Sequence, residues 1–149
     1  MGIVYSFVSC NKPMQFDKDK WVECGQYDTH VLYVEGNTRY RMALWLEKNY
    51  KFCDKSLNEI WEKFEPFMKR DSLVDLETAQ KHHKITIITK QHNPNFLIGI
   101  DPWFDTDWIE IFFDENYMVS KVYYVHYNRK TKQQTERKIC GSCMTKEEE

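Results

Sequence analysis

The chain lacks the features that would direct it into or across a membrane. No run of about 18 apolar residues occurs, which excludes a transmembrane helix. The first residues have neither a basic start nor a long apolar core, so the sequence predicts no secretory signal. We therefore expect a cytoplasmic protein in a reducing compartment, with thiols rather than disulfides at its five cysteines.

Internal repeats, low-complexity tracts and interdomain linkers are also absent from the sequence. The length of 149 residues is typical of one domain. We expect a single globular domain over residues 1–149, with a short polar tail from about residue 144. An aromatic content of 15% favours a packed core over disorder. The net charge of -2 argues against a general nucleic-acid binder.

The hydrophobic pattern predicts a hairpin early in the chain. Residues 31–34 and 40–46 read as its two strands. Gly36 and Asn37 read as its turn, because both residue types tolerate positive φ. Alternation along the second strand places Tyr40, Met42, Leu44 and Leu46 on one face.

A helix is predicted next, over residues 56–68. Ser56 and Glu59 have the spacing of a capping box, in which each side chain satisfies the other residue's backbone N–H. Pro66 should kink or end this helix. A shorter helical turn is expected over residues 72–79. The apolar residues of the main helix follow the 3.6-residue period: Leu57, Ile60, Trp61, Phe64, Phe67 and Met68.

The remaining apolar segments read as strands with short connections, which implies antiparallel pairing. The predicted fold is therefore α+β: an antiparallel sheet of about six to seven strands with one main helix packed on one face. A β-sandwich with an inserted helix is the alternative. The other expected strands cover residues 3–8, 85–89, 96–100, 108–113 and 117–127, with a last one near 135–139.

The N-terminus matches the N-myristoylation pattern. Gly2 follows the initiator Met, Ser6 stands at the sixth position, and Cys10 is available for a second acyl chain. This pattern predicts association with a membrane through a lipid anchor. In the competing interpretation, residues 3–8 are a buried strand that hides Gly2 from any acyltransferase.

The cysteines suggest one metal site and no other cofactor. Cys140 and Cys143 form a CxxC pair whose thiolates could share a zinc ion. Cys10 and Cys24, or a histidine such as His30, would have to complete the site. A redox role is less favoured because the motif follows a strand rather than opening a helix. The preferred interpretation is that these cysteines are incidental.

Cys53 is the candidate nucleophile of a cysteine-dependent enzyme. It precedes the predicted helix, whose N-terminal amides could activate a thiol. Such an enzyme also needs a histidine within hydrogen-bond reach, and the spacing of the histidines does not single one out. A buried, unreactive thiol is the favoured interpretation.

The last third of the chain has an uneven charge distribution. Residues 101–115 hold six acids and no base, and residues 121–138 hold six bases and one acid. We expect the two blocks to lie on adjacent strands and neutralise each other. Alternatively, the basic block binds single-stranded nucleic acid, an acidic protein or anionic lipid. The nucleic-acid candidates are Lys121, Tyr123, Tyr127, Arg129, Lys130, Lys132, Arg137 and Lys138. Strand alternation puts Tyr124 on the face opposite to Tyr123 and Tyr127.

Large aromatic side chains gather in the predicted loop over residues 101–108. Trp103, Phe104 and Trp108 either fold back into the core, which is preferred, or anchor a partner protein. Each catalytic signal in the sequence is single and incomplete, and none indicates a small-molecule substrate. We therefore expect a non-enzymatic protein-interaction module, an adaptor or effector, that uses a sheet face and this loop. A single-stranded nucleic-acid binder is the alternative, and a cysteine-dependent enzyme is third.

Overall fold

The computed structural model describes residues 12–24, 37–64, 75–92, 105–128 and 130–141. Its strands are β1 (Lys84–His92), β2 (Asp105–Phe113), β3 (Val119–Asn128) and β4 (Gln133–Cys140). They form one antiparallel sheet in the order β1-β2-β3-β4. The helices are α2 (Lys18–Cys24), α3 (Thr38–Asn49), α4 (Leu57–Phe64) and α5 (Leu76–His82), with a 3₁₀ turn, η1 (Phe52–Asp54), between α3 and α4.

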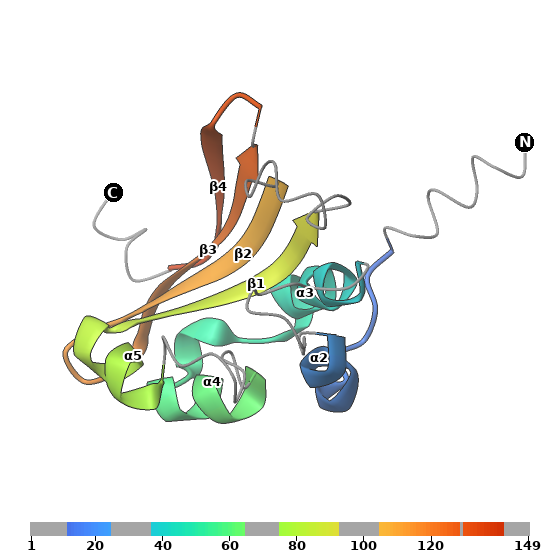
Figure 1. Ribbon diagram of the computed structural model, residues 1–149. Helices are drawn as coiled ribbons and strands as arrows, with labels where there is room; N and C mark the ends of the chain where they lie inside the picture. The colour runs from blue at the N-terminus through green and yellow to red at the C-terminus, as the bar shows by residue number, and fades with distance from the viewer. Residues whose placement is uncertain (1–11, 25–36, 65–74, 93–104, 129, 142–149) are drawn as a thin grey trace, which may run out of the picture.

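The helices lie on one side of the sheet (Figure 1). The α+β class and the antiparallel sheet are thus confirmed. In the described ranges the sheet has four strands rather than six or seven, and four α-helices stand where one main helix was expected. The predicted strands over residues 3–8, 31–34 and 96–100 lie outside the described residues. No helix in the described part of the chain is long and apolar enough to cross a membrane.

Helix α3 replaces the predicted second strand of the early hairpin, so that prediction is wrong. Asn37, expected in the hairpin turn, is instead the residue that precedes the first turn of the helix. Met42 and Leu46 do face the core, but Leu44 between them is only half-buried. The buried residues of α3 recur at positions i, i+3, i+4 and i+7, which is helical spacing: Arg39, Met42, Ala43 and Leu46.

A buried arginine helps to hold α3 against the rest of the fold. Arg39 donates from Nε to the carbonyl of Trp21 at 2.6 Å and from Nη1 to the carbonyl of Ile88 at 3.2 Å. Its guanidinium lies 5.0 Å from the centre of the Trp21 ring. Burial lowers the pKa of Arg39 to about 10, because desolvation disfavours the charged form. These contacts join α2, α3 and β1.

Helix α4 confirms the predicted capping box. The Ser56 amide donates to Glu59 Oε1 at 3.1 Å, and the Glu59 amide donates to Ser56 Oγ at 3.3 Å. Leu57, Ile60 and Phe64 are buried, as their spacing predicts. The continuation through Pro66 lies outside the described residues. Helix α5 covers the end of the predicted helical turn and begins after Asp75, which accepts from the Thr78 amide at 2.7 Å.

The core lies between the helices and one face of the sheet. Ile85, Ile87, Ile109, Ile111 and Val122 contribute fully buried side chains from β1, β2 and β3. The helices contribute Trp21, Met42, Leu46, Ile60 and Phe64, which are fully buried as well. Strand residues between the core positions point to the opposite face, because side chains alternate along a strand.

Candidate functional site

The sheet presents a second face on the side away from the helices, which we call the open face. Cross-strand pairing aligns Ile88, Trp108 and Val125 on β1, β2 and β3. Ile88 and Trp108 are half-buried, and Val125 is fully buried by its neighbours. The same face of β3 and β2 also carries the half-buried rings of Tyr123, next to Val125, and Phe112, which is separated from Trp108 by Glu110. An apolar row therefore crosses three strands on this face.

Charged side chains lie on this face to one side of the apolar row. Lys84 pairs with Glu110 at 2.5 Å. Lys84 Nζ lies 5.5 Å and Lys121 Nζ 4.8 Å from the centre of the Phe112 ring. Lys121 Nζ also lies 5.8 Å from the centre of the Tyr123 ring. The ammonium groups of these two lysines thus lie over aromatic rings, and Glu110 and Glu136 add carboxylates to the same face, so the rim of the open face carries both signs of charge.

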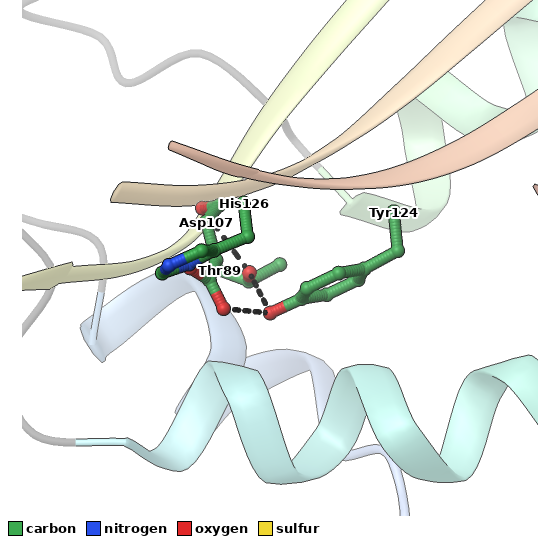
Figure 2. Close-up of polar contacts among 4 residues, drawn as sticks. All are labelled: Thr89, Asp107, Tyr124 and His126. Carbon is green, nitrogen blue, oxygen red and sulfur yellow. Dashed lines mark hydrogen bonds and ion pairs between the residues drawn. The ribbon is translucent and has the colours of Figure 1, made fainter. Parts of the chain in front are cut away.

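A polar cluster occupies the core side of the sheet toward one end of β2. Figure 2 shows its four side chains: Thr89, Asp107, Tyr124 and His126. Tyr124 Oη donates to Asp107 Oδ2 at 2.7 Å, and His126 Nδ1 lies 2.5 Å from Asp107 Oδ1. Thr89 Oγ1 contacts Tyr124 Oη at 3.1 Å and donates to the Asp107 carbonyl at 3.2 Å. Each carboxylate oxygen of Asp107 therefore has a partner.

Tyr124 is the most enclosed of these side chains besides Thr89. Its ring is 6.0 Å from that of Tyr40, and the Arg137 guanidinium lies 5.0 Å from its centre. Arg137 in turn forms an ion pair with Glu47 of α3. Burial raises the pKa of Tyr124, and the nearby Asp107 carboxylate raises it further. The phenol thus stays protonated and serves as a donor to Asp107.

Chemically, the cluster is an imidazole oriented by a buried carboxylate. Such a pair holds a general base in place in many enzymes, but a nucleophile within its reach is the other requirement. Cys53, the nucleophile suggested by the sequence, is joined to Cys140 by a disulfide instead. The contacts of Asp107 run to Tyr124 and His126, so the cluster fastens β2 to β3.

The disulfide corrects the expectation that the cysteines are all thiols. Cys53 lies in η1 and Cys140 at the end of β4, with their Cα atoms 6.0 Å apart. Cys24 is a free, half-buried thiol. Cys10 and Cys143, the other zinc candidates, lie outside the described residues. Among the residues that the structure describes, no three His, Cys, Asp or Glu side chains are grouped to hold a metal ion. The zinc site remains a prediction, and it would require Cys140 as a thiolate rather than in the disulfide with Cys53.

The predicted nucleic-acid residues separate over three places. Lys121, Tyr123, Tyr127 and Lys138 take open-face positions in the strand register. Arg137 lies on the core face beside Tyr124, as described above. Lys130 and Lys132 are exposed around the β3–β4 turn. Arg129 is outside the described residues.

The two charge blocks do lie on neighbouring strands, but the acids and bases whose ion pairs lie within the described residues are paired with residues outside these blocks or with His126. In the acidic block, Glu110 pairs with Lys84 of β1, and Asp107 pairs with His126. In the basic block, Arg137 pairs with Glu47 of α3. The pairs of Glu110 and Arg137 therefore tie the hairpin to β1 and α3, whereas the Asp107–His126 pair crosses from β2 to β3.

Of the candidate residues for lipidation and partner binding, the structure describes Trp108. Trp108 belongs to β2, so it is a strand residue of the open face rather than a loop residue. Trp103 and Phe104 lie outside the described residues, as does Gly2. Acylation of Gly2 and contact through the Trp103 loop therefore stay predictions.

Sequence reasoning missed the polar cluster, although its signal was present. Asp107 stands two residues before Ile109, and His126 stands two residues after Tyr124. The period of two thus puts both on the core-facing side of their strands. Comparison with known proteins found no matching family, no matching curated protein and no matching solved structure.

Proposed function

We propose that the protein is a non-enzymatic interaction module that binds a partner protein through its open face. The observation that carries this proposal is the row of Ile88, Trp108 and Val125 with charged side chains beside it. Protein interfaces have this arrangement, in which a central apolar anchor is enclosed by a polar rim. Tryptophan is also the residue type most enriched among those that dominate binding energy.

The charges of the open face indicate the chemistry of the partner. Lys121 lies beside the aromatic rings, and it would pair with a carboxylate on the opposing surface, whereas Lys84 is already paired with Glu110. The apolar row would receive an aliphatic or aromatic side chain. The expected partner surface is therefore an apolar projection with an acidic residue beside it.

Binding of single-stranded nucleic acid is the second candidate. It is favoured by Tyr123 and Tyr127, which share the open face with Lys121 and Lys138. Rings and cations in such an arrangement can stack bases and contact phosphates. Glu110 pairs with Tyr123 in the register and places a carboxylate among these rings. The central row of Ile88, Trp108 and Val125 is apolar and would face no phosphate, so a protein partner with an apolar projection is the better fit.

The proposal is tested by affinity capture with two open-face variants. Trp108→Ala removes the anchor, and Lys121→Glu reverses a rim charge while leaving the apolar row intact. We expect each to weaken capture of a given partner about tenfold or more. Lys48→Glu is the matched control, because it reverses an exposed charge on α3 at the helical side.

Circular dichroism and thermal unfolding establish that each variant is folded. Retention of the same partners by both folded open-face variants would contradict the proposal. Capture that is lost after nuclease treatment, with affinity for oligonucleotides falling linearly on a log–log salt plot, would favour the nucleic-acid candidate instead.

A further inference from the structure

Three aromatic rings from separate parts of the chain surround one ammonium group. Lys63 Nζ lies 4.3 Å from the centre of the Phe16 ring, 4.7 Å from that of Tyr50 and 5.9 Å from that of Phe64. All three distances fall within the roughly 6 Å over which a ring face attracts a cation. We call the set of Phe16, Tyr50 and Phe64 the aromatic cage.

The rings of the aromatic cage are held in place by their own packing. Phe16 precedes α2, Tyr50 follows α3, and Phe64 ends α4. Phe64 is fully buried, and its ring lies 5.5 Å from that of Phe16 and 5.9 Å from that of Tyr50. Trp21 of α2 contacts both Phe16 and Phe64. Because Phe16 and Tyr50 are only half-buried, the cage has a buried floor and two walls that solvent reaches.

Lys63 is an imperfect occupant of this cage. In the described part of the chain its ammonium forms no ion pair and donates no hydrogen bond, so the rings are its contacts. Burial lowers the pKa of Lys63, because desolvation disfavours the charged form, and the positive charge of Lys55 lowers it further. Lys55 Nζ itself lies 5.3 Å from the centre of the Tyr50 ring, so two like charges share one wall of the cage.

A quaternary ammonium group suits these rings better than the primary ammonium of a lysine. It carries the same positive charge, but it has no N–H donors that require acceptors when water is removed. The site also has a negative charge nearby. Burial raises the pKa of Tyr50 to about 12, with a contribution from the Glu59 carboxylate, which therefore lies close enough to this wall to favour a bound cation.

We propose that the aromatic cage is a binding site for a quaternary ammonium group, such as that of choline or of a trimethylated lysine, and that Lys63 occupies it in the unliganded chain. The ammonium of Lys63 stands in for the charge of the ligand. A ligand displaces this flexible side chain, whose ammonium then regains its hydration. The helices that carry the cage lie on the side of the sheet opposite to the open face, so the two sites can be occupied independently (Figure 1).

The experiment is an NMR titration of the full chain with choline and, separately, with Nα-acetyl-trimethyllysine. The indole resonance of Trp21 reports binding, because its ring contacts Phe16 and Phe64. Lys63→Gln removes the resident charge, and we expect it to bind the ligand about threefold to tenfold more tightly than the unsubstituted chain. Lys81→Gln, at an exposed lysine of α5, is the matched control and should leave the affinity unchanged. The ligand that binds more tightly identifies the source of the ammonium group.

Two further comparisons test whether the rings recognise the charge. The neutral alcohol 3,3-dimethyl-1-butanol has the shape of choline, and it should bind the Lys63→Gln variant about tenfold or more weakly than choline does. Adding Phe16→Leu to Lys63→Gln keeps an apolar side chain but removes a ring, and it should weaken choline binding as well. Equal affinity for the neutral alcohol, or no loss with Phe16→Leu, would overturn the proposal. Failure of Lys63→Gln to bind either ligand, or to bind more tightly than the unsubstituted chain, would also overturn it.

Discussion

Asp107 is a carboxylate that is only 7% exposed, and its two oxygens are matched by a phenol and an imidazole. A buried charge is costly unless such partners are present. Tyr124 is the more important partner, because its hydroxyl also contacts Thr89. At the scale of single residues, the stability of the β2–β3 pairing should therefore depend on one hydroxyl group.

Tyr124→Phe is expected to lower the free energy of unfolding by about 1–3 kcal/mol, because Asp107 loses its buried donor. Urea denaturation measures the change. Tyr127→Phe removes the same hydroxyl from a half-buried residue of the open face, and it should change the free energy by no more than about 0.5 kcal/mol. Equal effects of the two variants would contradict the importance assigned to the Asp107 contacts.

The helix α3 shows at the scale of elements why one prediction failed. Tyr40, Met42, Leu44 and Leu46 alternate as a strand would, and the Gly36–Asn37 pair precedes them as a hairpin turn would. The helical period becomes clear only when Arg39 is counted among the buried residues, because it completes the spacing with Met42 and Leu46. Charged residues are normally counted as exposed, so the pattern was hidden.

Two lysine substitutions distinguish the helix from the strand. In the strand interpretation Ala43 faces solvent and Leu44 faces the core, whereas in α3 Ala43 is fully buried and Leu44 is half-buried. We expect Ala43→Lys to destabilise the fold by about 3–5 kcal/mol, because it buries an unpaired charge. Leu44→Lys should cost clearly less in the same thermal or urea unfolding experiment. A larger destabilisation by Leu44→Lys than by Ala43→Lys would favour the strand interpretation.

Elements with a local chemical signature were predicted well. The capping box at Ser56 marks the start of α4, and the alternation through Ile109, Ile111 and Phe113 marks β2. Both signals depend on residues close in sequence, so one chain suffices to find them. The open face follows from the same alternation once the strands pair in register.

The disulfide shows at the scale of the whole molecule what sequence could not supply. Cys53 and Cys140 are separated by 87 positions, and no local rule pairs two of five cysteines across such a distance. The absence of a predicted secretory signal led us to expect free thiols. The fold instead places Cys53 and Cys140 close enough to form a disulfide. Tertiary proximity, which arises from packing β4 near η1, decides the outcome.

Removing the crosslink should destabilise the whole fold. Cys53→Ser is expected to lower the free energy of unfolding by about 2–4 kcal/mol, because it frees the unfolded chain from a long closed loop. Cys24→Ser is the matched control, since that thiol is free, and it should have a much smaller effect. Urea denaturation under non-reducing conditions measures both. If Cys53→Ser unfolded at the same urea concentration as the unsubstituted protein, the crosslink would not constrain the unfolded ensemble.

The crosslink also gives the chain a covalent topology of its own. Residues 53–140 form a closed ring that holds α4, α5 and all four strands, while α2 and α3 belong to a linear arm that precedes it. Denaturant can unfold the helices and the sheet, but the unfolded chain still contains this closed ring. If the oxidised molecule is pulled by its two ends, the force passes through the disulfide. The residues before Cys53 and after Cys140 can then be extended, whereas the segment between the two cysteines, which holds β1–β4, adds no length.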